Sequence, residues 1–217
     1  MKNENRKQIC ISLIFITAFI LWTVAVKFID VQEIGPRATS VGFATLNGYF
    51  HSLTGVNMTL YTITDWLGLV PVALAFGFGV LGLVQWINRK SILKVDYDIL
   101  VLGVFYIIVF SAYLLFEMFV INYRPVLING YLEASYPSST TLLVLCVMPT
   151  SLMQLKTRIK NSKISKCISF AIIAFIIFVV VGRLISGVHW ITDIIGGILL
   201  SVGLVLMYRA VCNLKTE

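Results

Sequence analysis

Three residues with complementary chemistry lie close together near the C-terminal end of the 217-residue sequence: Arg183, His189 and Asp193. His189 and Asp193 are four positions apart and share one face if they lie on a helix. The carboxylate would then accept an N–H bond from the imidazole and leave the other ring nitrogen free to attack or to take a proton. Ser186-Gly187 predicts a turn, so that Arg183 ends one helix, His189 begins the next, and both face one pocket.

A second polar cluster supplies groups that bind anions. Pro137, followed by hydroxyl residues and an apolar run, predicts a helix start. The hydroxyl residues are Ser138, Ser139, Thr140 and Thr141. Free N–H groups at such a helix end bind phosphate, and Arg124 and Arg183 are able to hold the same anion. Two arginines, a helix N-terminus and a His–Asp pair predict a phosphoryl-transfer site with a histidine nucleophile, and no carboxylate cluster suggests a metal.

The elements that must position these groups are apolar. Hydrophobic residues make up 59% of the chain and charged residues 12%, with a mean hydropathy of +0.93. Soluble domains are roughly 45–50% apolar and about 25% charged. We therefore predict an integral membrane protein with a single domain over residues 1–217, and the lipid bilayer as its surroundings. The net charge of +7 is assigned to cytoplasmic loops rather than to nucleic-acid binding.

Six apolar segments approach or exceed the roughly 20 residues that a spanning helix needs. They are 8–29, 64–87, 97–121, 140–155, 167–185 and 189–209. The predicted fold class is all-α, a polytopic bundle of six transmembrane helices. Basic residues gather before the first segment, between the second and third, between the fourth and fifth, and at the end of the sixth. The positive-inside rule therefore puts both termini in the cytoplasm.

The same rule puts three connections on the outer face, and the polar residues with them. These connections are 30–63, 121–139 and 185–189. In the first, the run 41–51 is predicted as a short amphipathic helix in the membrane interface, although two glycines weaken the pattern.

A glycine-rich run lies in the second apolar segment. Gly77, Gly79 and Gly82 have the spacing of a dinucleotide-binding loop, but they follow no strand and lie within a spanning helix. Small residues that permit close helix packing are the better interpretation.

The polar residues resemble the signature of the type 2 phosphatidic acid phosphatase (PAP2) superfamily. Its parts are Lys-x6-Arg-Pro, Pro-Ser-Gly-His and Ser-Arg-x5-His-x3-Asp. The third part is matched by Arg183, His189 and Asp193, with Gly182 in place of serine. The first two are matched in part, by Arg124-Pro125 and Pro137-Ser138. The order, spacing and six-span layout extend the resemblance, and the core of a PAP2-like helical bundle, over about 60–209.

The resemblance implies a role for each matching residue. His189 would attack phosphorus and Asp193 would orient it. Phosphate oxygens would be held by Arg124, Arg183 and the helix end that carries Ser138, Ser139 and Thr140. No metal or other cofactor is implied.

Two positions depart from the family pattern. Glu117 stands where the family has lysine, and there it either pairs with Arg124 or weakens the anion site. Thr140 stands where the family has the histidine that protonates the leaving group, and such general acid help is typically worth about 10²–10⁴-fold. A lipid diphosphate, which expels a phosphate monoester, depends least on that help. His51, the other histidine, is a remote alternative as the acid.

The favoured hypothesis is a bacterial plasma-membrane lipid phosphatase that works at the outer face through a phosphohistidine. The resemblance implies polyprenyl diphosphate, phosphatidylglycerol phosphate or phosphatidic acid as substrate. The alternative is a PAP2-like pseudoenzyme that binds lipid phosphate as a sensor, partner or carrier. A transporter would carry ionisable residues in mid-span, whereas Asp65 and Asp193 lie near predicted helix ends.

Overall fold

The computed structural model describes residues 2–214, and 77% of the chain is helical. The α-helices are α1 (Lys2–Phe28), α2 (Ala44–Thr54), α3 (Met58–Leu67), α4 (Leu69–Arg89), α5 (Tyr97–Met118), α6 (Ser139–Arg158), α7 (Ser162–Ile185) and α8 (Ile191–Asn213). Two 3₁₀ turns, η1 (Pro36–Ala38) and η2 (Ile92–Lys94), lie in connections. Over the described residues the chain forms isolated β-bridges but no strands, so the all-α prediction is confirmed.

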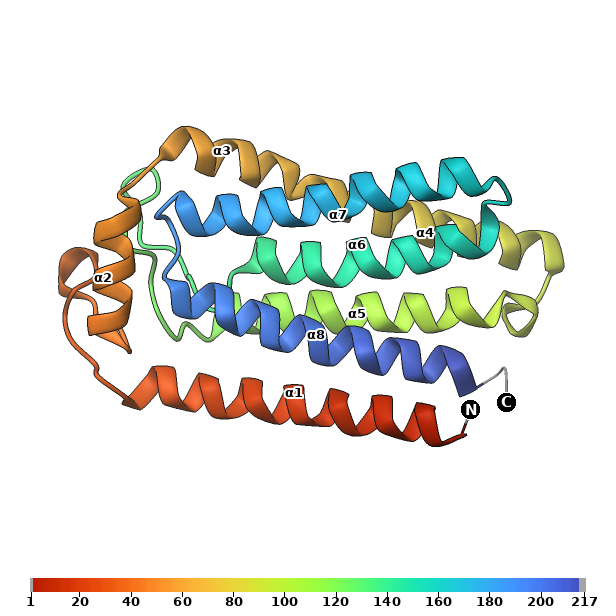
Figure 1. Cartoon of the computed structure of the whole chain (residues 1–217), viewed down its shortest axis with the longest axis horizontal. Coiled ribbons are helices and arrows are strands. Elements are labelled where there is room, and N and C mark those ends of the chain that lie inside the picture. The colour runs from red at the N-terminus through yellow and green to blue at the C-terminus, as the bar shows by residue number, and fades with distance from the viewer. Residues whose placement is uncertain (1, 215–217) are drawn as a thin grey trace.

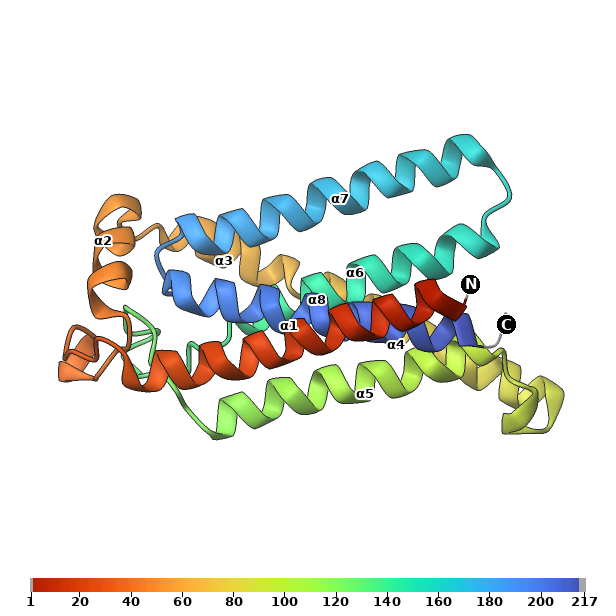
Figure 2. The ribbon, with the colours of Figure 1, turned by 60° about the horizontal axis from the view of Figure 1, so that its bottom comes forward.

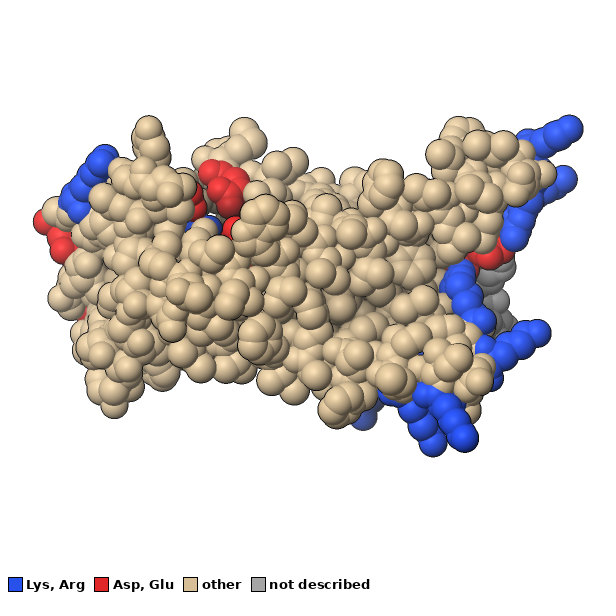
Figure 3. Space-filling model, turned by 90° about the horizontal axis from the view of Figure 1, so that it is seen from above, with Lys and Arg blue, Asp and Glu red and all other residues tan. Residues whose placement is uncertain are grey.

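The long helices form an elongated bundle with both termini at one end (Figure 1). Among the described residues, five segments are long and apolar enough to cross a membrane. They are Glu4–Phe28, Met58–Arg89, Tyr97–Met118, Ser162–Ile185 and Ile191–Asn213. Figure 3 shows a wide uncharged belt between the two ends, with many Lys and Arg side chains at the end that holds the termini. The chain is therefore a multi-pass membrane protein.

Helix α6 is the segment that hydropathy alone does not select. It runs alongside α5 and α7 in the bundle (Figures 1 and 2), and most of its residues are buried. Its polar side chains have partners inside: Thr150 lies 3.2 Å from the Tyr106 hydroxyl, and Gln154 donates to the Tyr208 hydroxyl at 2.6 Å. A buried helix meets protein rather than lipid, so it need not be apolar on all sides. The count of six spans depends on α6 and stays a prediction.

The second span begins earlier than its apolar run suggests. Helix α3 starts at Met58 and continues into α4 through a bend at Gly68, so residues 58–63 are helical rather than part of the outer connection. The Asn57 side chain accepts a bond from the Leu60 N–H at 2.9 Å and caps α3. This extension brings the polar face of α3 to the end of the bundle opposite the termini.

Helix α2 lies across the end of the bundle opposite the termini (Figure 1) and contacts the α7–α8 connection. The buried Asn47 side chain donates to Thr192 Oγ1 at 3.0 Å and accepts from the Thr192 N–H at 3.3 Å. Gly187 has a φ of +64°, and a Cβ there would lie 1.7 Å from the Gly55 carbonyl oxygen, so only glycine fits. Residues 47–55 thereby fix the turn that leads into α8.

Candidate active site

The polar residues of interest meet at the end of the bundle opposite the termini. Arg183 lies in the last turn of α7, His189 in the connection to α8, and Asp193 in the first turn of α8. Arg124 comes from the α5–α6 connection. Residues from three separate parts of the chain are therefore brought to one end of the bundle.

His189 and Asp193 interact, but not on one helix. Because α8 begins at Ile191, His189 lies before it, and the shared-face argument was wrong. The His189 Nδ1 atom is 3.6 Å from Asp193 Oδ2, too long for a hydrogen bond. Ser135 joins the two: its hydroxyl donates to Asp193 Oδ2 and lies 3.3 Å from His189 Nδ1. The Trp190 N–H also donates to Asp193 Oδ2, at 2.8 Å.

His189 is held in its neutral form with one nitrogen available. Its side chain is 1% exposed, and Nε2 has no hydrogen-bond partner among the described residues. Burial, followed by the positive charges of Arg124 and Arg183, holds the pKa of His189 well below its usual range. At neutral pH the Nε2 lone pair is therefore free to act as a nucleophile.

Both arginines stack on the Tyr61 ring from α3. The guanidinium carbon of Arg183 is 4.8 Å from the ring centroid and that of Arg124 is 5.5 Å away. Arg183 pairs with Asp65 Oδ1 at 3.3 Å, and Arg124 pairs with Glu133 Oε2 at 3.2 Å. The side chains of Asp65 and Glu133 are 52% and 40% exposed, so each buried guanidinium meets an acid at the edge of the site.

Several nitrogens in this cluster are buried without partners among the described residues. They are Arg124 Nη1, Arg183 Nε, Arg183 Nη1 and His189 Nε2. Leaving a buried donor unpaired costs roughly 1–3 kcal/mol, and more when the group is charged. Figure 3 shows acidic side chains around a recess, with a basic side chain visible within it. The arrangement is suited to binding an anion with several acceptor oxygens.

The N-terminus of α6 faces the same cluster. The helix starts at Ser139, directly after Pro137-Ser138, which confirms the predicted helix start. The Ser138 side chain caps no backbone N–H, and its own N–H donates to the Asp193 carbonyl at 3.1 Å. The first-turn N–H groups, those of Ser139 and Thr140 among them, have no partner within the helix. They therefore remain available to an anion.

Thr140 and Glu117 stand at the two positions that depart from the family pattern. Thr140 is 7% exposed and packs on the α3–α4 bend, where a Cβ on Gly68 would lie 3.3 Å from Thr140 Cγ2. Glu117 is exposed in the last turn of α5 and lines a small cavity with Ser135 and Ser139. The acid that pairs with Arg124 is Glu133 rather than Glu117.

Sequence reasoning missed Ser135, Tyr61, Asp65 and Glu133. Tyr61 and Asp65 are four positions apart on α3, a spacing that puts both on one face, and this signal was available once residues 58–63 were taken as helix. Ser135 lies in an irregular loop, and its spacing gives no signal for its contact with His189 and Asp193. His51 packs against Trp190 with the two rings tilted and 5.6 Å between their centroids.

Comparisons with known proteins agree with the fold. Residues 73–216 match the model of the PAP2 superfamily. The structure is similar to that of the first transmembrane PAP2 type phosphatidylglycerolphosphate phosphatase from Bacillus subtilis, with a TM-score of 0.60 and 18% sequence identity. That similarity covers 94% of this chain and 96% of the other. No curated protein sequence matches significantly.

Proposed function

The chain belongs to the PAP2 superfamily, and we propose that it is an integral membrane phosphatase that hydrolyses a lipid phosphate or diphosphate. The observation that carries the proposal is the set of buried nitrogens without partners on Arg124, Arg183 and His189. Two guanidiniums beside a neutral imidazole match a phosphoryl group, whose oxygens accept bonds while its phosphorus accepts a nucleophile.

Binding of the phosphoryl group would use both arginines and the N-terminus of α6. Arg124 and Arg183 donate to its oxygens from one side, and the N–H groups at Ser139 and Thr140 donate from another, behind Ser138. Tyr61 fixes both guanidiniums, while Asp65 and Glu133 orient them at the edge.

Attack would come from His189 Nε2. The lone pair forms an N–P bond as the P–O bond to the lipid leaving group breaks, which gives a phosphohistidine. Asp193 stabilises the positive imidazole that forms, with Ser135 holding both side chains in register. Water then attacks phosphorus, the N–P bond breaks, and inorganic phosphate leaves while the water proton passes to solvent.

The leaving group decides which substrates react well. Thr140 cannot protonate an alkoxide at neutral pH, so a diphosphate that expels a phosphate monoester is the favoured substrate. We place the site at the extracytoplasmic face of a bacterial plasma membrane, since the basic end of the molecule holds the termini.

The test is phosphate release by the purified protein in lipid vesicles from polyprenyl diphosphate, phosphatidylglycerol phosphate and phosphatidic acid. We expect release that is fastest with the diphosphate and lost in His189→Ala. Release that persists in His189→Ala would contradict the mechanism. No release from any of the three, by this chain or by Thr140→His, would contradict the enzyme.

A second candidate rests on Thr140 and Glu117, which replace the family's histidine and lysine. In that case the same cradle binds a lipid phosphate without turnover, as a sensor, partner or carrier. Tight binding of a lipid phosphate with no turnover, unrestored by Thr140→His, would favour it.

A further inference from the structure

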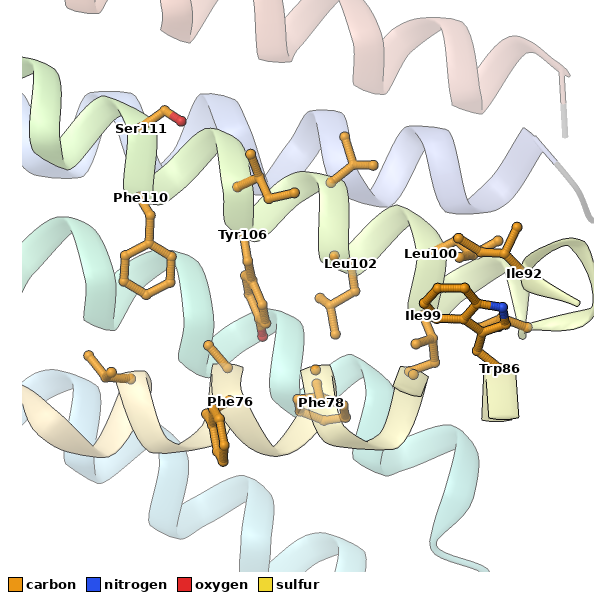
Figure 4. A pocket seen from close by; sticks show the side chains of 18 of the residues that line it. Phe76, Phe78, Trp86, Ile92, Ile99, Leu100, Leu102, Tyr106, Phe110 and Ser111 are labelled. Atoms are coloured by element: carbon orange, nitrogen blue, oxygen red, sulfur yellow. The ribbon is translucent and has the colours of Figure 1, made fainter. Parts of the chain in front are cut away.

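A long apolar groove runs between α4 and α5, outside the polar site. Its volume is about 730 Å³, and Figure 4 shows side chains from both helices directed into it. Of its lining residues, Tyr106 and Ser111 alone carry a side-chain hydroxyl. The Tyr106 hydroxyl lies 3.2 Å from Thr150 and 3.3 Å from Ser151 in α6, so Tyr106 offers its ring to the groove. The groove is therefore suited to hydrocarbon.

Glycines form the hollow. At Gly79 of α4 and Gly103 of α5, both of which line the groove, a Cβ would meet nothing within 4 Å. At Gly82, by contrast, a Cβ would lie 3.2 Å from Ile99 of α5. The close packing predicted for the glycine-rich run of α4 holds at Gly82 and is wrong at Gly77 and Gly79. The absent side chains leave open space instead of a helix contact.

The groove ends next to the polar site. On α4 its outermost lining residue is Val72, four positions after Gly68, which contacts Thr140. On α5 it is Leu114, three positions before Glu117, which lines the small cavity shared with Ser135. One helical turn is about 5.4 Å, so the groove ends about one turn from these residues. One lipid can therefore place its phosphate in the site and its chain in the groove.

The groove is longer than one leaflet of a bilayer. Its walls run from Val72 to Trp86 on α4 and from Ile99 to Leu114 on α5. At about 1.5 Å per residue, each wall is roughly 21–23 Å long. The hydrocarbon of a bilayer is about 30 Å thick, or roughly 15 Å per leaflet. A chain that enters from the outer end and fills the groove therefore passes the mid-plane.

We propose that the α4–α5 groove binds the hydrocarbon chain of the lipid whose phosphate enters the polar site, and that it selects a chain longer than one leaflet. This rests on the proposed function for the headgroup. A chain of that length contacts the whole groove. An acyl chain confined to the outer leaflet does not reach the part of the groove near Ile99 and Trp86.

The test fills the groove and measures binding without turnover. In a His189→Ala background, Gly103→Leu and Gly79→Leu put a side chain into open space, so neither needs to disturb packing. Gly77→Leu is the matched control, because Gly77 also lies in α4, also has open space, and does not line the groove. We expect each groove variant to raise the Kd for a radiolabelled long-chain polyprenyl phosphate at least tenfold, and the control to leave it unchanged.

A series of chain lengths completes the test. Affinity should keep rising beyond chains that fill one leaflet, and Gly103→Leu should remove that rise while leaving the affinity for a five-carbon phosphate unchanged. Equal affinities in both groove variants and the parent, or a change only in oligomeric state, would overturn the proposal. Turnover is measured separately, in the chain that retains His189. Absence of turnover contradicts the proposed phosphatase, whereas the proposed role of the groove is tested by the binding measurements.

Discussion

The two sides of the candidate site are built differently. His189, Asp193 and Ser135 are buried and joined to one another, and the turn that carries His189 is fixed by α2. Thr140 packs on the α3–α4 bend, and Glu117 is exposed at the end of α5. The residues proposed to form the N–P bond are buried and linked through Ser135. The side that would release the leaving group is suited to a leaving group that needs little protonation by a general acid.

The largest effect is expected from breaking the attacking side. His189→Ala should lower phosphate release from a lipid diphosphate at least about 10⁴-fold, since residues that act as a nucleophilic unit carry effects of this size or more. His51→Ala is the matched control, because it removes the other histidine and its contacts with Trp190 and the Gly187 backbone but none of the groups proposed to hold or attack phosphate. A loss of activity in His51→Ala as large as in His189→Ala would contradict the assignment of His189 to the attacking side.

Repairing the leaving-group side should give the next largest effect. Thr140→His should raise hydrolysis of a lipid monophosphate by roughly 10²-fold or more, because a general acid is worth about 10²–10⁴-fold. Hydrolysis of the diphosphate should change far less. Initial rates on the two substrates measure the ratio, with Thr140→Ser as the control that adds no acid. An equal gain on both substrates would show that Thr140 limits binding instead.

Ser135→Ala removes the hydroxyl that links His189 and Asp193, and so tests how much the attacking side depends on this link. Its hydroxyl bonds the Asp193 carboxylate, and a hydrogen bond to a charged group is worth about 1.5–3 kcal/mol, or roughly 10–100-fold in rate. We expect kcat to fall by that factor with little change in KM. Ser169→Ala, which removes a hydroxyl bonded within α7, should have no effect. A change confined to KM would place Ser135 in substrate binding.

The smallest expected effect is a shift with pH. The pKa of His189 is lowered by burial and by both arginines, so between that pKa and about 6.5 the folded protein holds fewer protons than the unfolded chain. Stability linked to His189 is therefore complete above about pH 6.5 and is lost as the pH falls through the lowered pKa. The acid limb of kcat/KM should lie below pH 6.5 and move upward in Arg124→Gln. A limb that stays in place would argue against this electrostatic coupling.

Much of the site follows from the sequence, because local spacing fixes it. The turn at Ser186-Gly187, the start of α6 and the placement of Arg183 at the end of α7 all depend on residues close together in the chain. Glycines gave the weakest guidance: the same residue permits close packing at Gly82 and leaves open space at Gly79. Whether a glycine gives close packing or open space depends on the neighbouring helix, and the spacing of residues along one helix does not contain that information.

The parts that the sequence did not predict depend on distant segments. Ser135 reaches His189 from 54 positions away, through a loop with no regular pattern. Tyr61 was hidden because polar residues at the start of α3 lower its hydropathy and made the connection before it look longer than it is. Asp65 lay inside the predicted segment 64–87, but its pairing with Arg183 joins distant parts of the chain. Helix α6 is polar in places where it meets protein instead of lipid, so hydropathy alone does not select it.

The central claim, that His189 is the nucleophile, is tested most directly by trapping the intermediate. The purified chain is mixed with a lipid diphosphate labelled with ³²P at the terminal phosphate and quenched in alkali after a single turnover. The protein is then digested and the labelled peptide sequenced. We predict an alkali-stable, acid-labile phosphate on His189 that is lost in His189→Ala and retained in His51→Ala. Turnover without a labelled protein, or label on another residue, would contradict the account.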